Sequence, residues 1–246
     1  MRVLVTFALD AEFGPWRRYR KFAETQGGRS TIYSARLDGM AIDVLLTGIG
    51  GKHTRLESME RFQNGNMDLC ISCGTAGALR PDYRIGQVLV AKEVRSAGMP
   101  GSIAADELFL QAAVKSGATE VHSFYTVDHV IVSATEKQEL GRNSDVVEME
   151  SFDVLHQAAA LGAKVIAIRG ISDLAHENLP LDFNRVTTAS GRISLARVLA
   201  EIAMHPTSLP SLVRFGQHSK DAAESLARFL DRYMQALAVI SNQAVS

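Results

Sequence analysis

The stretch KVIAIRGISD, residues 164–173, begins as a short apolar run and ends in glycine, serine and aspartate. Its first six residues predict a buried strand over Lys164–Arg169, because the run is short and rich in β-branched side chains. A similar run predicts a strand over Asp145–Met149. Polar residues follow both strands, and they are the first indication of a site at the strand ends.

Outward from this stretch, the hydrophobic pattern changes several times between the periods of a strand and of a helix. Such alternation is typical of an α/β fold. Further strands are expected over residues 2–8, 31–37, 40–47, 68–72, 87–91 and within 120–133, and helices over residues 10–22, 52–63, 105–116, 184–204 and 220–240. No internal repeat or linker interrupts the pattern, so residues 1–246 are expected to form a single domain.

A hairpin is expected around Asp38-Gly39, which separates the β-rich runs Thr31–Leu37 and Met40–Thr47. Two-residue turns with these residues adopt positive φ angles and close a type I′ turn. The two runs should therefore pair as neighbouring antiparallel strands.

The composition excludes several classes of protein. With 246 residues, of which 46% are hydrophobic and 22% charged, the chain is neither disordered nor fibrous, and it can bury a core without a metal or a disulfide. Lys and Arg (26) balance Asp and Glu (27), which argues against a nucleic-acid partner. No apolar run approaches the roughly 20 residues of a membrane helix, and a cytoplasmic protein is expected.

Cys70 and Cys73 form a CxxC pattern, which also occurs in redox pairs and zinc sites. Here the pair belongs to a predicted buried strand, where residues three apart point to opposite faces. We therefore interpret both residues as core thiols and expect no metal site.

The residues after each predicted strand matter most, because ligands of open α/β sheets bind at the carboxyl ends of the strands. Five such segments are rich in glycine, carboxylates and small polar residues: Ala8–Glu12, Thr47–Gly51, Gly74–Gly77, Val147–Ser151 and Arg169–Asp173. The GIGG of the second segment lacks the spacing of a dinucleotide-binding loop and the lysine of a P-loop, which disfavours an NAD-linked oxidoreductase. Each segment alone is weak evidence, but together they bring three carboxylates to strand ends.

In this order the segments resemble those of the nucleoside phosphorylase family and, within it, the 5′-methylthioadenosine/S-adenosylhomocysteine nucleosidases. The family's A-M-x-x-E is similar to Ala8–Glu12, S-G-I-G to Thr47–Gly50, G-S-A-G-G-L to Gly74–Leu79, V-E-M-E-A to Val147–Ser151 and R-A-I-S-D to Arg169–Asp173. The resemblance implies a three-layer α/β/α sandwich around a mixed, partly barrel-like sheet. It also implies an enzyme that needs no metal or organic cofactor, binds a small nucleoside and forms a homo-oligomer.

The resemblance further implies roles for individual residues in breaking a purine N-glycosidic bond by water. Asp173 would be the general acid at purine N7, Glu150 would bind the ribose 2′ and 3′ hydroxyls, and Glu12 would orient and deprotonate the water. Cleavage of this bond requires protonation of the leaving group and stabilisation of an oxocarbenium-like sugar, and carboxyl groups can do both. The other implied site residues are Arg169 and Thr75 near the water, Met149 beneath the sugar, Leu9 and Ile49 at its border, Val130 and Ile131 at the adenine edge, and Gly74 and Ser172 as further substrate contacts.

Phosphate is the alternative nucleophile. Family phosphorylases carry an arginine two residues before the glycine of the glycine-rich turn, where this chain has Ser72, and Glu12 would repel a dianion. Arg17, Arg18 or Arg36, or an arginine from another subunit, could still supply an anion site.

Two departures from the nucleosidase pattern keep other substrates open. The chain between Val94 and Ala105 is short, and the region after Asn178 is closer to phosphorylase relatives associated with hopanoid biosynthesis, which act on an adenosylated lipid. Val130 replaces an aromatic residue that stacks on adenine, for which Phe124 or Tyr125 could compensate. A catalytically silent nucleoside-binding protein is the third interpretation, because a fold does not fix a function.

Overall fold

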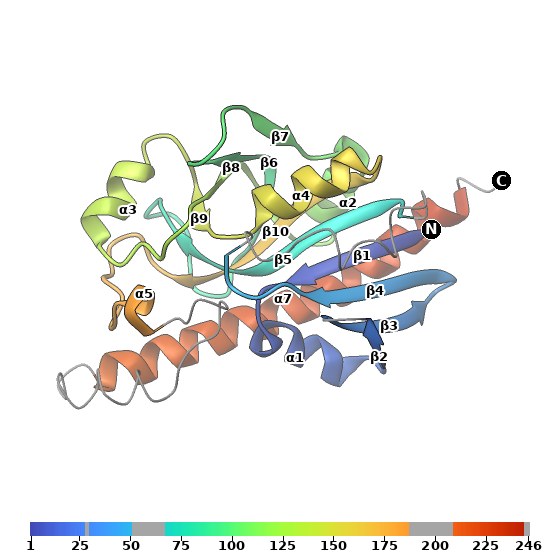
Figure 1. Ribbon diagram of the computed structural model, residues 1–246, viewed down its shortest axis with the longest axis horizontal. Helices are drawn as coiled ribbons and strands as arrows, with labels where there is room; N and C mark the ends of the chain where they lie inside the picture. The colour runs from blue at the N-terminus through green and yellow to red at the C-terminus, as the bar shows by residue number, and fades with distance from the viewer. Residues whose placement is uncertain (28–29, 51–66, 187–208, 244–246) are drawn as a thin grey trace.

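The computed structural model describes residues 1–27, 30–50, 67–186 and 209–243, in which strands and helices alternate along the chain (Figure 1). The strands are β1 (Arg2–Phe7), β2 (Ala23–Gly27), β3 (Ser30–Leu37), β4 (Met40–Leu46), β5 (Leu69–Ala78), β6 (Val88–Ser96), β7 (Ser102–Ala104), β8 (Thr119–Thr126), β9 (Val146–Glu148) and β10 (Lys164–Asp173). The helices are α1 (Asp10–Tyr19), α2 (Glu107–Lys115), α3 (Ala134–Leu140), α4 (Ser151–Ala160), α5 (Phe183–Val186) and α7 (Leu209–Gln243).

The described strands form one mixed sheet that closes partly on itself. Its order is β10-β6-β8-β9-β5-β1-β4-β3-β2, and β7 pairs with β6 at the side. Because β10 also pairs with β5 in parallel, the five strands from β10 to β5 form a closed barrel. The strands β1, β4, β3 and β2 extend outward from β5, so the expected mixed, partly barrel-like sheet is confirmed.

Helices cover both faces of this sheet. On one face, α1, α2 and α7 bury large side chains such as Trp16, Phe109 and Tyr233 in one core cluster. On the other face, α4 buries Phe152 and Leu155 in a second cluster. Figure 1 shows α7 running along the sheet over most of the length of the molecule. The three-layer arrangement expected from the sequence is therefore confirmed.

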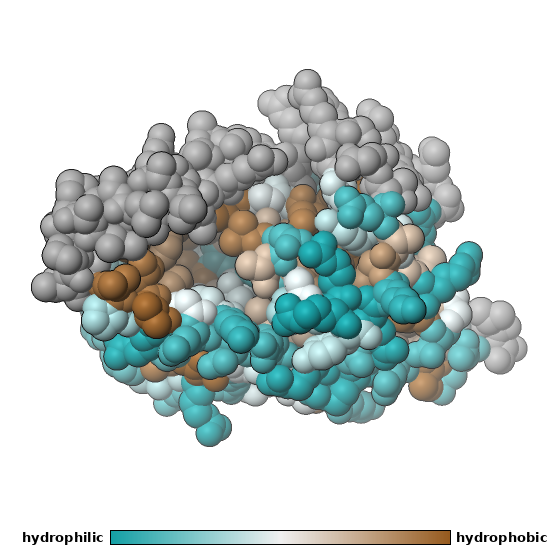
Figure 2. All heavy atoms as spheres, turned by 90° about the horizontal axis from the view of Figure 1, so that it is seen from below, coloured by the Kyte–Doolittle hydropathy of each residue, from teal (hydrophilic) through white to brown (hydrophobic). Residues whose placement is uncertain are grey.

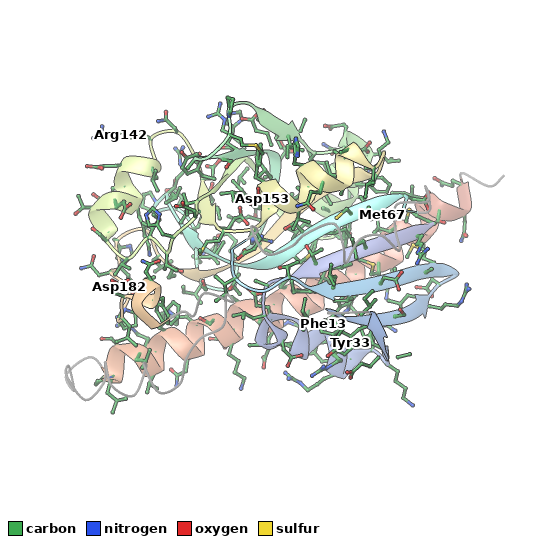
Figure 3. The ribbon with its side chains drawn as sticks, in the orientation of Figure 1. Phe13, Tyr33, Met67, Arg142, Asp153 and Asp182 are labelled. Carbon is green, nitrogen blue, oxygen red and sulfur yellow. The ribbon has the colours of Figure 1, made fainter. Side chains whose placement is uncertain are left out.

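Aromatic side chains hold α1 against the outer strands. Phe13 of α1 and Tyr33 of β3 lie next to each other, with ring centroids 5.1 Å apart (Figure 3). The guanidinium of Arg17 lies over the Tyr33 ring, 5.3 Å from its centroid. These contacts fix the helix that begins directly after β1 and places Glu12 at the end of that strand.

Two local predictions are confirmed. Asp38 and Gly39 have φ angles of 49° and 85°, and they connect the antiparallel strands β3 and β4 as a type I′ turn requires. Cys70 and Cys73 are free and buried, and they belong to core clusters on opposite faces of the sheet.

Strands β5 and β10 are longer than predicted. They continue to Ala78 and Asp173, so segments that the sequence analysis placed in turns after the strands lie inside them. The glycines there make room for carboxylates: a methyl group at Gly74 would lie 3.0 Å from Oε1 of Glu12. A strand with small residues at these positions can therefore carry acidic side chains close to its backbone.

The predictions of helices differ from the structure in several places, and helix α4 was among the elements not predicted. The helix expected over residues 10–22 ends at Tyr19, and the edge strand β2 follows. Helix α3 was not predicted, although Ser133 caps it by accepting from the backbone N–H groups of Thr135 and Glu136. The final helix begins at Leu209 instead of residue 220. The helix expected over 52–63 and most of the one over 184–204 lie outside the described residues.

Candidate active site

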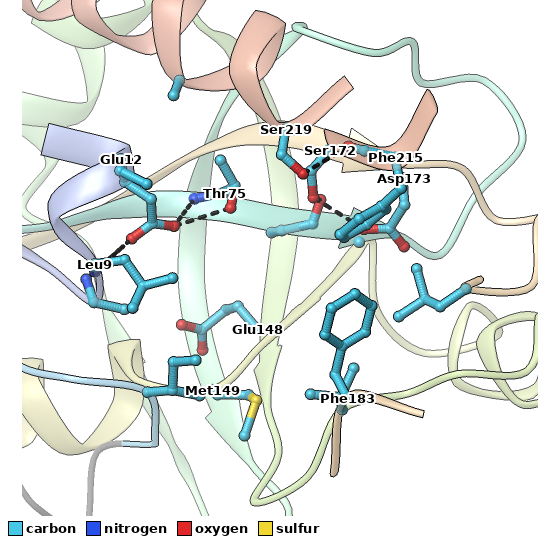
Figure 4. Close-up of a pocket in the computed structure, with 18 of the residues that line it drawn as sticks. Leu9, Glu12, Thr75, Glu148, Met149, Ser172, Asp173, Phe183, Phe215 and Ser219 are labelled. Atoms are coloured by element: carbon cyan, nitrogen blue, oxygen red, sulfur yellow. Dashed lines mark hydrogen bonds between the residues drawn. The ribbon is translucent and has the colours of Figure 1, made fainter. Parts of the chain in front are cut away.

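A cavity lies where β1, β5, β9 and β10 end. Its volume of about 600 Å³ is within the usual range for a small-molecule site. Most of its lining is apolar, and four carboxylates enter it: Glu12, Glu148, Glu150 and Asp173. Figure 4 shows Glu12 at one end of the cavity and Asp173 at the other. Helix α7 contributes part of the wall through Phe215, Gly216, Ser219, Lys220 and Ala223.

Glu12 occupies the first turn of α1 and folds back onto the end of β1. Its Oε2 accepts hydrogen bonds from the backbone N–H groups of Ala8 (3.1 Å) and Leu9 (3.0 Å). Its Oε1 accepts from both the backbone N–H (2.7 Å) and the hydroxyl (2.9 Å) of Thr75 on β5. All four partners are donors, so the carboxylate is held in one orientation as a hydrogen-bond acceptor at the cavity wall.

Glu148 forms a buried ion pair with Arg169. Both side chains are 1% exposed, and Nη2 of Arg169 lies 2.6 Å from Oε2 of Glu148. The same nitrogen donates to the hydroxyls of Ser72 (3.2 Å) and Ser151 (2.8 Å). Burial alone would raise the pKa of Glu148, but the guanidinium and several hydrogen bonds hold this pKa below its ordinary value. Glu148 is therefore the charged partner of Arg169.

Glu150, two residues further on, lies farther from the guanidinium of Arg169 than Glu148 does. Its Oε2 lies 3.9 Å from Nη2 of Arg169, and its Oε1 accepts from the backbone N–H of Gly50 at 3.0 Å. Burial and the charge of Glu148 raise the pKa of Glu150 to about 8. At neutral pH, Glu150 is consequently a neutral carboxyl group.

Asp173 is the last residue of β10, and both of its carboxylate oxygens are engaged. The ammonium of Lys137, from α3, donates to Oδ1, and the hydroxyl of Ser172 donates to Oδ2 at 2.9 Å. The close approach depends on Gly77, because a methyl group there would lie 2.9 Å from Oδ1. Asp173 therefore lies at the cavity wall as half of an ion pair.

The structure brings together most of the site residues expected from the sequence. Ten of them line the cavity: Leu9, Glu12, Ile49, Thr75, Val130, Ile131, Met149, Glu150, Ser172 and Asp173. Two do not line it. Arg169 lies behind Glu148, and Gly74 lies behind Glu12, where it leaves space for the carboxylate.

Several residues of the site were missed. Lys137 went unnoticed because α3 was not predicted, although the pattern Ser133-x-x-Glu136 is typical of a helix start. Phe183 and Phe215 supply the aromatic wall, with ring centroids 5.2 Å apart. The suggestion that Phe124 or Tyr125 fills this place is wrong, because neither lines the cavity and Phe124 is fully buried in the core.

The backbone of Val130 already has a partner. The side-chain amide of Asn184 accepts from its N–H at 2.7 Å and donates to its carbonyl at 3.0 Å. The amide of Asn184 thus presents one acceptor and one donor side by side to Val130, as the edge of adenine would. A base that is read by Val130 would have to displace Asn184.

Searches for other kinds of site among the described residues gave negative results. In residues 1–27, 30–50, 67–186 and 209–243, no group of three or more His, Cys, Asp or Glu side chains is arranged to hold a metal ion. No helix of these residues is both long and apolar enough to span a membrane. The face drawn in Figure 2 is mainly hydrophilic among the coloured residues, and hydrophobic side chains gather there in a hollow and at one end.

Comparison with known families decides the affiliation. The model of the Phosphorylase superfamily matches residues 2–203, which is most of the chain. The chain belongs to this superfamily. Within the superfamily, its relatives include 5′-methylthioadenosine/S-adenosylhomocysteine nucleosidases. That of Anoxybacillus flavithermus is 22% identical over 239 residues, covering 87% of this chain and 97% of the relative, and that of Geobacillus kaustophilus is 23% identical over 230 residues, covering 83% and 97%.

Solved structures of the superfamily share the fold. The 5′-methylthioadenosine/S-adenosylhomocysteine nucleosidase of Neisseria meningitidis, in complex with methylthio-immucillin-A, matches with a TM-score of 0.73 at 19% identity, covering 96% of this chain and 99% of that one. A futalosine hydrolase mutant of Helicobacter pylori matches with a TM-score of 0.71 at 17% identity, covering 96% and 99%. At such identities the likeness establishes the architecture, and the chemistry has to be argued from the site.

Proposed function

We propose that this protein hydrolyses the N-glycosidic bond of an adenine nucleoside of the methylthioadenosine or S-adenosylhomocysteine type. One observation carries the proposal: the carboxylates of Glu12 and Asp173 lie at opposite ends of a single cavity, with Met149 and Glu150 also in its wall (Figure 4). Cleavage of such a bond needs an acid on the leaving purine and a base on the attacking water. The separation of the two carboxylates supports this division of work.

Each end of the cavity has chemistry that suits its proposed role. Asp173 would deliver a proton to purine N7, since it lies beside the buried ammonium of Lys137 and the hydroxyl of Ser172. Glu12 would hold the water and take its proton, because the donors from Ala8, Leu9 and Thr75 fix the carboxylate in place.

The sugar and the base would bind between these ends. Glu150 would accept the ribose hydroxyls above Met149, and Arg169 would act only through Glu148, which it holds in position. Leu9 and Ile49 would border the sugar. The segment of Val130 and Ile131 would meet the adenine edge, and the rings of Phe183 and Phe215 provide the aromatic surface near it.

The charges around Glu12 favour water over phosphate. Among the described residues, the arginine and lysine side chains that line the cavity are Arg18 and Lys220, and both are exposed and form ion pairs with Glu224. Arg169, the cation nearest the sugar wall, is already paired with Glu148. A phosphate dianion beside Glu12 would meet repulsion from this carboxylate, and the guanidinium nearest the sugar wall is already neutralised.

The test is adenine release from methylthioadenosine, S-adenosylhomocysteine and adenosine, each measured in phosphate-free buffer and again with added phosphate. The proposal expects equal release in both buffers and a sugar product without phosphate, which keeps the 5′ substituent of its nucleoside. Release that depends strictly on phosphate, with the corresponding sugar 1-phosphate as product, would contradict it. Tight nucleoside binding without release in either buffer would instead identify a silent binding protein.

Two variants make the assay specific for the site. Glu12→Gln keeps the shape of the side chain but places an amide among four donors, so adenine release should fall by about 10² to 10⁴. Glu24→Gln changes an exposed carboxylate on the edge strand β2 and should leave release unchanged. Equal loss in both variants would contradict the assignment of Glu12.

A second candidate is phosphorolysis of a nucleoside with a larger apolar 5′ group. The observation that favours it is the extension of the cavity between α1 and α7, where Ala11, Pro15, Gly216 and Ala223 add apolar wall beyond the carboxylates. An adenosylated hopanoid offered with and without phosphate tests this candidate directly. Release from this compound alone, and only with phosphate, would favour it over hydrolysis of small nucleosides.

A further inference from the structure

Lys137 is a fully buried lysine next to the proposed active site. Its side chain has no exposed surface, whereas the other lysines of the described segments are exposed or partly exposed. Removing an ammonium group from water costs several kcal/mol unless it is paired and hydrogen-bonded. A lysine in this position therefore calls for a specific partner, and that partner is Asp173.

All three N–H bonds of the ammonium are used within the protein. Besides Asp173, the Nζ atom donates to the backbone carbonyls of Leu174 and Glu177, each at 3.1 Å. Lys137 does not line the large cavity, so it has no donor to offer a substrate. Any effect that it has on a ligand must pass through Asp173.

The ion pair with Lys137 makes Asp173 an acceptor of hydrogen bonds. Oδ1 accepts from the ammonium of Lys137, and Oδ2 lies 2.9 Å from the hydroxyl of Ser172, which also lies 3.2 Å from the carbonyl oxygen of Ala76. Purine N7 is also an acceptor, and it needs a proton as the glycosidic bond breaks. In this arrangement, the ammonium of Lys137 is the group of the pair that holds the proton.

We infer that Lys137 is a positioning residue that also supplies the proton which Asp173 passes to the leaving purine. One proton leaves Nζ, is carried on the Asp173 carboxyl group and ends on purine N7. The electron pair of the C1′–N9 bond stays with the purine, and water adds to C1′ while its proton goes to Glu12. Lys137 ends as a neutral amine and Glu12 as a carboxylic acid, and both are reset by solvent. The inference rests on the proposed function.

A second cavity offers the route for resetting the pair. It measures about 240 Å³, reaches Asp173 and is lined by polar residues that include Glu177, Arg214 and His218. Other ionisable groups near the pair lie on the large cavity and on α3, where Glu136 is 3.6 Å from His129. Those on the large cavity are Glu12, Arg18, His129, Glu148, Glu150 and Lys220. These groups are unchanged in the variants below, so differences between the proteins report on Lys137.

The test is the alkaline limb of the pH–rate profile, where adenine release falls as the pH rises. The relay predicts that the wild-type protein releases adenine as long as Lys137 has a proton to supply. In Lys137→Met, Asp173 must take a proton from solvent, so the limb moves to lower pH by more than one unit and release falls about tenfold per further unit. If Lys137 only placed its charge beside an Asp173 protonated from solvent, losing the cation would favour protonation and move the limb to higher pH.

Two further variants separate charge from proton supply. Lys137→Arg keeps the positive charge but holds its proton, because arginine does not deprotonate in proteins. The relay therefore predicts a loss at pH 8 similar to that of Lys137→Met, and arginine activity close to the wild type would overturn it. Lys137→Gln also removes the ammonium and serves as a second test beside Lys137→Met. Thermal unfolding shows whether each variant folds, and the one that folds is used for the comparison.

Adenine binding distinguishes failure of the relay from failure of the proposed function. Calorimetry at pH 8 in two buffers of different ionisation enthalpy measures the protons taken up on binding. The relay predicts uptake of one proton by Lys137→Met and none by the wild type, and equal uptake would overturn it. A wild type that releases no adenine from any nucleoside, but shows this difference in proton uptake, would contradict the proposed reaction and leave the relay standing.

Discussion

Glu148 and Glu150 share one cation unequally: Nη2 of Arg169 lies 2.6 Å from Glu148 and 3.9 Å from Glu150. The nearer carboxylate keeps its charge, and that charge, together with burial, raises the pKa of its neighbour to about 8. Two carboxyl groups of one short segment thus have different protonation states at neutral pH.

The stability of the protein should depend on pH through Glu150. Its pKa is raised from 4.5 to about 8 on folding, so between these values the folded state binds a proton that the unfolded state lacks. The free energy of unfolding should therefore fall as the pH rises from 4.5 to 8, by at most about 1.4 kcal/mol per unit. Urea unfolding between pH 5 and 9 measures this slope. Glu150→Gln should show a shallower slope, and identical slopes would contradict the assignment.

Removing Arg169 should destabilise the fold strongly. Arg169→Met leaves Glu148 buried with its charge unpaired, which costs about 3 to 5 kcal/mol. Lys164→Met, on the same strand, is the matched control. The side chain of Lys164 is exposed, so its ion pair with Asp106 contributes about 0 to 1 kcal/mol to the free energy of unfolding. Both values come from urea unfolding at pH 7. A small loss for Arg169→Met would mean that Glu148 takes up a proton instead.

Gly77→Ala should impair activity more than folding. The added methyl group would lie 2.9 Å from Oδ1 of Asp173, so this carboxylate has to move away from Lys137 and from the cavity. We expect adenine release to fall at least about tenfold while the circular dichroism spectrum is retained. Gly14→Ala on α1 is the control, since its methyl group has no neighbour closer than 4.0 Å. Unchanged release in Gly77→Ala would show that the position of Asp173 is not critical.

Asn184→Ala should strengthen adenine binding if Val130 reads the base. The amide of Asn184 occupies both the N–H and the carbonyl of Val130, and a bound adenine would have to break these two hydrogen bonds. Without the amide we expect the dissociation constant of adenine to fall several-fold, because each hydrogen bond contributes about 0.5 to 1.5 kcal/mol. Calorimetry measures it. Weaker binding would show that Asn184 contacts the ligand instead.

Sequence patterns predicted the elements in which the local signal and the tertiary structure agree. The hairpin at Asp38-Gly39 is an example, because the turn requires positive φ angles and these residues tolerate them. The edge strand β2 could not be found in this way, since its sequence AETQG has no alternating apolar pattern. An edge strand buries little, and its pairing with β3 alone determines it.

The candidate site was predictable where chemistry and resemblance coincide, as for Glu12 and Asp173. The partners of these groups were harder to predict. Gly74 and Gly77 looked like turn residues, but they lie within β5, where the missing side chains admit two carboxylates. Lys137 is distant from Asp173 in sequence and belongs to a helix of seven residues, too short for a periodic pattern to show. Its pairing exists only in the folded chain.

The match to the superfamily model is shorter than the part of the chain that folds together. The superfamily model ends at residue 203, but α7 begins at Leu209. Within α7, Tyr233 is fully buried and donates to the carbonyl of Phe109, and Phe215 closes the cavity. A gene fragment cut at the family boundary would therefore expose one face of the sheet and open the site to solvent at once.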